Sequence, residues 1–129
     1  MESLSPNIFV TDIKQTVNFY KILGFTTEMT VPEDGEHMVW AMMKNGKVTF
    51  MFQTLASLDE SDDNLPHVSR TNGGSLLLYI SVKDIKALFD RIKNKVTVLK
   101  ALEKTFYGAT EFTILDNNNY VLTFAEHDA

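Results

Sequence analysis

The feature that most constrains the fold is a short segment that occurs twice. Val10-Thr11-Asp12-Ile13-Lys14 is matched by Val82-Lys83-Asp84-Ile85-Lys86, which lies 72 residues further along the chain. In both copies a run of β-branched and apolar residues precedes an Asp, whose carboxylate can accept the free N–H groups of a first helical turn. Each copy therefore predicts a strand and then a helix capped by Asp12 or by Asp84. A repeat at this distance indicates a duplicated structural unit.

The first copy also predicts where its helix ends. Val17, Tyr20 and Leu23 recur at helical spacing, and Gly24 follows at the point where a residue in the left-handed conformation is favoured. The next strand is expected at 26–31. These positions define a strand, a helix and a second strand within the first 31 residues.

The clearest hairpin follows this unit. Segments 37–44 and 47–54 both have strand character, and the two residues between them are Asn45-Gly46, which tolerate the positive φ values of a type I′ turn. This turn predicts that Lys44 opposes Lys47. By the same register, Trp40 is expected opposite Met51.

The duplication predicts an α+β fold of two tandem βαβββ modules in a single domain, residues 1–129. Module one covers about residues 1–55 and module two about residues 75–129. The polar, turn-rich segment 56–74 connects them. An Asn-rich turn at 117–119 lies at the same offset from the hairpin turn of module one, which supports a complete repeat.

Composition excludes several classes of function. The chain has no cysteine, so disulfides, thiolate nucleophiles and cysteine-based metal sites are absent. A net charge of −5 opposes binding to nucleic acid, which requires a positive surface. No apolar run approaches the length that crosses a bilayer, and the N-terminus lacks the basic and apolar regions of a signal peptide. We therefore expect a cytoplasmic protein without nucleic-acid or membrane partners.

Two signatures carry a resemblance to a known family. VTDIKQTVNFYKILGF near the start and FYGATEFTILDNNNYVLTFAE near the end, together with the duplication, resemble the vicinal oxygen chelate superfamily. This superfamily includes glyoxalase I, bleomycin resistance proteins and extradiol dioxygenases, and the resemblance covers almost the whole chain. It implies curved mixed sheets around a concave cleft, helices on the outer face, and a homodimer.

The resemblance also implies where a metal would bind. Metal-using members place four His, Gln or Glu ligands on the concave face, and the corresponding residues here are Ser5, Met51, Leu77 and Thr123. Thioether and alkyl groups cannot replace nitrogen or charged oxygen donors. We expect no metal and no other cofactor, and we expect His37, His67 and His127 to be surface residues.

Period-two alternation assigns the strand side chains to two faces. The face expected to pack under the helices is uniformly apolar: Ile8, Val10, Leu76, Leu78, Ile80, Val82, Leu122 and Phe124. The candidate ligand-binding residues on the other face and at its rim are Asn7, Phe9, Met38, Trp40, Met42, Met51, Gln53, Tyr79, Phe106, Tyr107 and Glu111. Thioethers and aromatic rings suit planar or amphipathic organic ligands, but the same residues are typical of a core or a subunit interface.

Three functions are compatible with this pattern. The first is metal-free binding of a small aromatic or amphipathic molecule, which could be cationic. The second is a glyoxalase-like lyase or isomerase acting next to a carbonyl, with Glu111 as the single catalytic candidate if burial raises its pKa. The third is a non-catalytic domain whose apolar face binds another subunit or partner.

Overall fold

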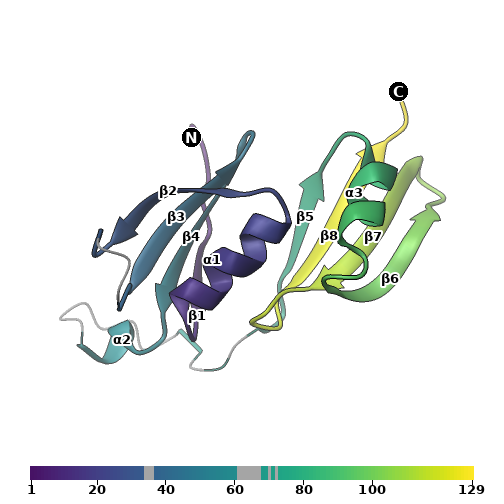
Figure 1. Ribbon diagram of the computed structural model, residues 1–129. Helices are drawn as coiled ribbons and strands as arrows, with labels where there is room; N and C mark the ends of the chain where they lie inside the picture. The colour runs from purple at the N-terminus through teal and green to yellow at the C-terminus, as the bar shows by residue number, and fades with distance from the viewer. Residues whose placement is uncertain (34–36, 61–67, 70, 72) are drawn as a thin grey trace. The chain divides into compact units, whose positions relative to one another are not determined.

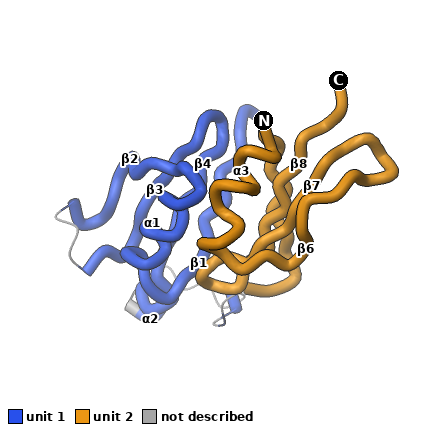
Figure 2. The backbone as a smooth tube through the Cα atoms, turned by 45° about the vertical axis from the view of Figure 1, so that its right-hand side comes forward, with its two compact units in different colours: residues 1–72 blue, residues 73–129 orange. Residues whose placement is uncertain are grey.

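The computed structural model describes residues 1–33, 37–60, 68–69, 71 and 73–129, and it divides into two compact units, residues 1–72 and 73–129 (Figure 2). Unit 1 contains β1 (Asn7–Val10), α1 (Ile13–Ile22), β2 (Thr26–Val31), β3 (Trp40–Asn45), β4 (Val48–Thr54) and the short α2 (Ser57–Glu60). Unit 2 contains β5 (Leu77–Ser81), α3 (Ile85–Ile92), β6 (Thr97–Lys104), β7 (Ala109–Leu115) and β8 (Val121–His127).

Both units have the same topology, which confirms the predicted α+β duplication. The strand order is β1-β4-β3-β2 in unit 1 and β5-β8-β7-β6 in unit 2. In each sheet the first strand pairs in parallel with the last, and the other pairs are antiparallel. α1 crosses one face of the unit 1 sheet and α3 one face of the unit 2 sheet (Figure 1). We call the opposite face of each sheet its open face; among the described residues, the short α2 alone reaches it, through Ser57 in unit 1.

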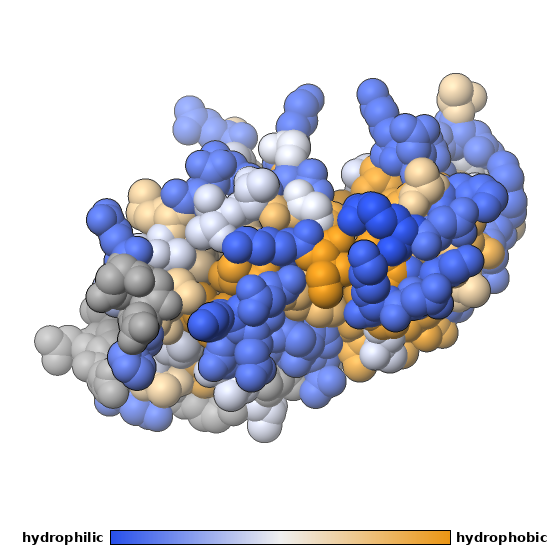
Figure 3. All heavy atoms as spheres, in the orientation of Figure 1, coloured by the Kyte–Doolittle hydropathy of each residue, from blue (hydrophilic) through white to orange (hydrophobic). Residues whose placement is uncertain are grey.

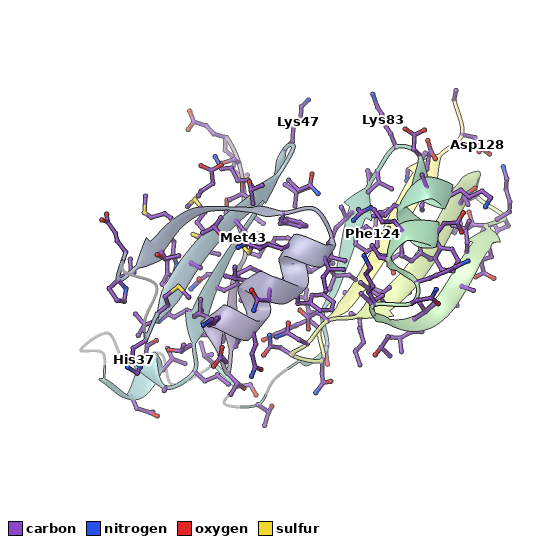
Figure 4. The ribbon with its side chains drawn as sticks, in the orientation of Figure 1. His37, Met43, Lys47, Lys83, Phe124 and Asp128 are labelled. Atoms are coloured by element: carbon purple, nitrogen blue, oxygen red, sulfur yellow. The ribbon has the colours of Figure 1, made fainter. Side chains whose placement is uncertain are left out.

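An aromatic cluster forms the core between α1 and its sheet. Tyr20 is fully buried, and its ring centroid lies 4.8 Å from that of Phe52 and 5.5 Å from that of Phe25. Phe25 stacks on Phe50 at 5.3 Å. Met43 points into the same layer beneath the helix (Figure 4). The face that sequence alternation assigned to the helix is therefore the buried one.

Unit 2 has a smaller core of the same design. Phe112 stacks on Phe124 at 5.1 Å, and the ring of Phe89 from α3 lies 5.0 Å from that of Phe112. Ile80 and Leu122 are buried as predicted. Leu76 is an exception, because it precedes the first residue of β5 and is half exposed. Hydrophilic side chains dominate the space-filling view over the helices (Figure 3).

The helix caps confirm one prediction and correct another. The Asp12 carboxylate accepts a hydrogen bond from the Gln15 amide at 2.8 Å, and Gly24 has φ 98° after the last turn of α1, as predicted. Asp84 has φ 54° and its side chain makes no capping bond. The carboxylate of Glu126 caps α3 instead, because it accepts the amides of Asp84 at 3.2 Å and Ile85 at 3.1 Å.

The hairpin forms as predicted, but its register differs by one pair. Asn45 pairs with Val48, so the loop residues are Gly46 and Lys47, and Trp40 lies opposite Gln53 instead of Met51. Gly46 alone of the two has positive φ, at 59°, as in a type II′ turn, which places Gly first. The shift moves partners by two residues, so each side chain keeps its predicted face.

The turn between β7 and β8 is longer than two residues. Leu115 pairs with Val121, and the Asp116 carboxylate accepts the amides of Asn118 and Tyr120 at 2.8 and 2.9 Å. A Cβ on Gly73, which has φ 82°, would lie 2.7 Å from the backbone oxygen of Asn119, so the chain passes this turn closely.

The predicted connection at 56–74 lies partly outside the described residues. Its described part begins with α2 and ends with two glycines, Gly73 and Gly74, that both have positive φ. Among the described helices, none is long and apolar enough to cross a membrane.

Candidate ligand-binding site

The open face of the unit 2 sheet carries the strongest polar cluster. Tyr79 on β5 pairs with Thr123 on β8, and Glu111 on β7 pairs with Ala125 on β8. Because side chains two residues apart share a face, the alternation also brings His127 to this side of β8. All of these residues lie opposite the face covered by α3.

Glu111 is the centre of this cluster. Tyr79 Oη donates a hydrogen bond to Glu111 Oε2 at 2.5 Å, and Tyr107 Oη donates to the same oxygen at 2.6 Å. Tyr79 and Glu111 are on strands separated by β8, where the fully buried Ala125 leaves room for the phenol to reach across. Tyr107 lies directly before Gly108, whose φ of 83° turns the chain into β7. The sequence predicted all three as site residues, and the fold brings them together.

The two hydroxyls fix the ionisation of the site. Burial alone would raise the pKa of the Glu111 carboxyl. The hydrogen bonds from Tyr107 and Tyr79 outweigh that effect, with smaller contributions from the neighbouring His127 and Lys100, and hold the pKa below its ordinary 4.5. The bond to Glu111 raises the pKa of Tyr79 to about 12 and is also the main cause of the raised pKa of Tyr107. At neutral pH the site is therefore a carboxylate held by two protonated phenols.

His127 joins the cluster, which the sequence interpretation missed. Its Nε2 lies 3.3 Å from Tyr79 Oη, and the two ring centroids are 6.0 Å apart. Tyr79 has one hydroxyl proton, which lies in the bond to Glu111, so His127 Nε2 must be the donor in this contact. The signal was present in the alternation of Thr123, Ala125 and His127, but the residue was assigned to the tail.

Glu111 forms no ion pair among the described residues, although Lys100 lies near enough to lower its pKa. No Lys, Arg or His nitrogen of that part of the chain forms an ion pair with it, and Lys100 pairs with Glu103 at 3.7 Å. Its second oxygen, Oε1, accepts no hydrogen bond from the same residues. The cluster is an ionised carboxylate with one open oxygen, beside aromatic rings that are about half exposed.

Unit 1 presents a different open face. Asn7 Nδ2 donates to Gln53 Oε1 at 2.9 Å, and Gln53 Nε2 donates to Ser57 Oγ at 2.9 Å. Ser57, from α2, was not among the predicted residues. On the same face Met42 pairs with Met51, and both are half-buried. This face combines a short chain of neutral hydrogen-bonding groups with thioethers.

The remaining predicted residues divide between the units. Phe9 and Trp40 both pair with Gln53 and are half-buried on the unit 1 face. Met38 lines a pocket of about 390 Å³ at the start of α1, together with Thr11, Asp12, Ile13, Lys14, His37 and Thr54. Phe106 is almost fully exposed and contacts Tyr107 edge-on at 5.0 Å. His37 is exposed, and His67 lies outside the described residues.

The four expected metal-ligand positions do not have the donors that a metal needs. Ser5 is exposed before β1, Met51 is half-buried, and Leu77 is half exposed. Thr123 is buried, and its hydroxyl is hydrogen-bonded to that of Thr113 at 2.8 Å. In the part of the chain that the structure describes, no three His, Cys, Asp or Glu residues are grouped so that they could hold a metal ion.

Comparison with solved structures gives close matches of fold. A glyoxalase/bleomycin resistance protein/dioxygenase family enzyme from Burkholderia phytofirmans matches with a TM-score of 0.76 and 23% identity, over 96% of this chain and 97% of that one. TioX from Micromonospora matches with a TM-score of 0.76 and 17% identity, over 99% and 100%. A bleomycin resistance determinant encoded on the transposon Tn5 matches with a TM-score of 0.68 and 16% identity, over 100% of both chains.

The sequence itself gives the family. Comparison with curated proteins gives no match. The family model described as the Glyoxalase/Bleomycin resistance protein/Dioxygenase superfamily matches residues 4–124, which is nearly the whole chain. With the duplicated βαβββ fold, this match shows that the chain belongs to the glyoxalase/bleomycin resistance protein/dioxygenase superfamily.

Proposed function

We propose that this chain is a metal-free binding protein for a small aromatic or amphipathic molecule that carries positive charge. The observation that carries the proposal is that the Glu111 carboxylate is ionised and is hydrogen-bonded by two tyrosines. It is held by Tyr79 and Tyr107, and it forms no ion pair among the described residues. An anionic group beside exposed aromatic rings is suited to an organic cation, because the rings and the carboxylate both attract positive charge.

Two further features support a ligand of this kind. The chain has a net charge of −5, which favours the approach of cations. Considered separately, the open face of unit 1 offers polarizable thioethers and the hydrogen-bonded Asn7–Gln53 pair, which suit a planar aromatic ligand. One structural relative is a bleomycin resistance determinant, which is consistent with a binding function.

Fluorescence provides the first experiment. Trp40 is the only tryptophan and is half-buried on the open face of unit 1, so its emission is expected to respond to an aromatic ligand there. The protein should be titrated with a diverse set of planar compounds, cationic and neutral. A saturable response to cationic members supports binding at the unit 1 face. Calorimetric binding of the same cations that weakens in Glu111→Gln supports binding at the unit 2 cluster. No response across the set would contradict the proposal.

A lyase or isomerase reaction is the second candidate, and the geometry supports it less. A general base near neutral pH needs a raised pKa, whereas the tyrosine hydroxyls lower the pKa of Glu111. Turnover of a hemithioacetal that is lost in Glu111→Gln would favour catalysis. Absence of turnover in a protein that binds aromatic cations would favour binding alone.

We also propose that the chain forms a homodimer. β2 and β5 are edge strands with exposed apolar residues, Met29 and Val31 on one and Leu77 on the other. Such edges are commonly covered by another chain. Light scattering should give twice the mass of 14.6 kDa, and a monomer at all concentrations would contradict this.

A further inference from the structure

The two oxygens of the Glu111 carboxylate differ in the hydrogen bonds that they accept. Both hydroxyl bonds end on Oε2, at 2.5 and 2.6 Å, so the two lone pairs of that oxygen are in use. Oε1 accepts no hydrogen bond from the described residues. The carboxylate therefore offers a ligand one open oxygen instead of the two that a free carboxylate presents.

The nearest other carboxylate, that of Glu103 opposite Glu111 on β6, is already paired with Lys100 at 3.7 Å. The hydroxyl protons of Tyr79 and Tyr107 are both committed to Glu111, and His127 Nε2 donates to Tyr79 Oη. A bound cation thus meets one anionic oxygen that is not in an ion pair, beside phenol and imidazole rings. This arrangement limits how many N–H groups of a ligand can be satisfied.

The two tyrosines that bond to the Glu111 carboxylate are about half exposed. Tyr79 is 48% exposed, Tyr107 is 52% exposed, and Phe106 packs edge-on against Tyr107 at 5.0 Å. Aromatic rings attract cations and also accept the apolar N-alkyl groups of methylated amines. Alkyl groups on a cationic nitrogen bound at Glu111 are therefore expected to contact these aromatic rings.

We infer that the Glu111 cluster selects a protonated tertiary amine, with a single N–H group that bonds to Oε1. This rests on the proposed function and specifies its ligand class. A primary ammonium has three N–H groups and is strongly hydrated, and the site satisfies one of them. A quaternary ammonium leaves Oε1 without a donor, and a guanidinium needs both carboxylate oxygens for its two-pronged bond.

A matched series of ligands tests the inference by isothermal titration calorimetry. Benzylamine, N,N-dimethylbenzylamine and benzyltrimethylammonium are all cations at pH 7 and share one aromatic body, and benzyl alcohol is the neutral member. The tertiary amine is expected to bind about tenfold more tightly than the primary amine. This ratio corresponds to the loss of one charged hydrogen bond by the primary amine when it leaves water. The quaternary compound should lie between them.

Variants distinguish this site from general attraction by charge. Glu111→Gln should abolish the differences among the cations. Glu28→Gln, which changes net charge equally on an exposed residue of β2 in the other unit, should leave them intact. Tyr107→Phe keeps the ring but frees a lone pair on Oε2, so the preference for the tertiary over the primary amine should narrow.

The outcomes separate the inference from the proposed function. Equal or tighter binding of the primary amine, or an unchanged series in Glu111→Gln, would overturn the inference while aromatic binding stands. The same holds if no benzyl compound binds while Trp40 still responds to other planar ligands. Loss of every response would overturn both.

Discussion

Replacing Glu111 with Gln perturbs the tyrosine–carboxylate cluster with minimal change of shape. The hydrogen bond to Glu111 is the largest cause of the raised pKa of Tyr79, which is about 12 against an ordinary 10.0, and the charge of Glu111 adds to it. Removing the carboxylate should return the pKa of Tyr79 toward 10. At pH 11 about one-tenth of Tyr79 should be ionised in the native protein, and a clearly larger fraction in Glu111→Gln, where burial alone still holds the pKa up.

Site-resolved NMR measures this difference directly. Tyrosine labelled with ¹³C at Cζ reports ionisation through its chemical shift, and Tyr79→Phe assigns the resonance. Tyr120 is an internal control, because its raised pKa comes from burial and from Asp116, and Glu111 does not contribute. Circular dichroism at the same pH confirms that both proteins remain folded.

The same shift has a defined effect on stability. Because the folded pKa of Tyr79 is raised, its contribution to stability is complete below pH 10 and is lost as the pH rises through about 12. Glu111→Gln should lose less stability over that interval. A native Tyr79 that titrates near 10, or a variant in which it still titrates near 12, would refute the assigned hydrogen bond.

Other substitutions test the scaffold and the absence of metal. Glu126→Ala should lower the unfolding free energy by about 1 kcal/mol, because it removes the side chain that caps α3. Asp84→Asn should change the unfolding free energy by less than about 0.5 kcal/mol. Equal effects of the two substitutions in urea unfolding would contradict the cap assignment. Gly73→Ala should cost at least about 1 kcal/mol more than Gly46→Ala, because both have positive φ but only the first meets a backbone oxygen; equal costs would count against that contact. Phe52→Ala should cost about 3–5 kcal/mol, and a loss below about 1 kcal/mol would contradict the aromatic core. Elemental analysis should find no stoichiometric metal, and addition of Zn²⁺, Ni²⁺ or Mn²⁺ should not raise the melting temperature; a stoichiometric ion whose removal abolishes binding would contradict the metal-free proposal.

The repeating pattern was enough to predict the fold, because period and offset are local properties of the chain. Asp12 and Gly24 bound α1 as expected. The cap of α3 was not predictable in the same way, since Glu126 lies about 40 residues from the helix that it caps. The predicted hairpin register was also wrong. Asn45-Gly46 fits a type I′ turn as its two loop residues, but Gly46 also fits the first position of a type II′ turn, which is the turn that forms.

The candidate site was predicted in part. Alternation placed Tyr79 and Glu111 on one face, but the contact between them depends on the small Ala125 on the strand between them. His127 was missed because β8 continues further than the sequence pattern indicated. The direction of the pKa shift of Glu111 was also not predictable from burial alone, because two hydroxyl donors reverse it.

A crystal structure of the protein with N,N-dimethylbenzylamine tests the central claim most directly. We predict that the amine nitrogen lies within about 3.2 Å of Glu111 Oε1, that its methyl groups contact the rings of Tyr79 or Tyr107, and that no metal ion occupies the sheet face. A ligand bound elsewhere, or a cation coordinated at Met51 or Thr123 in its place, would contradict the account.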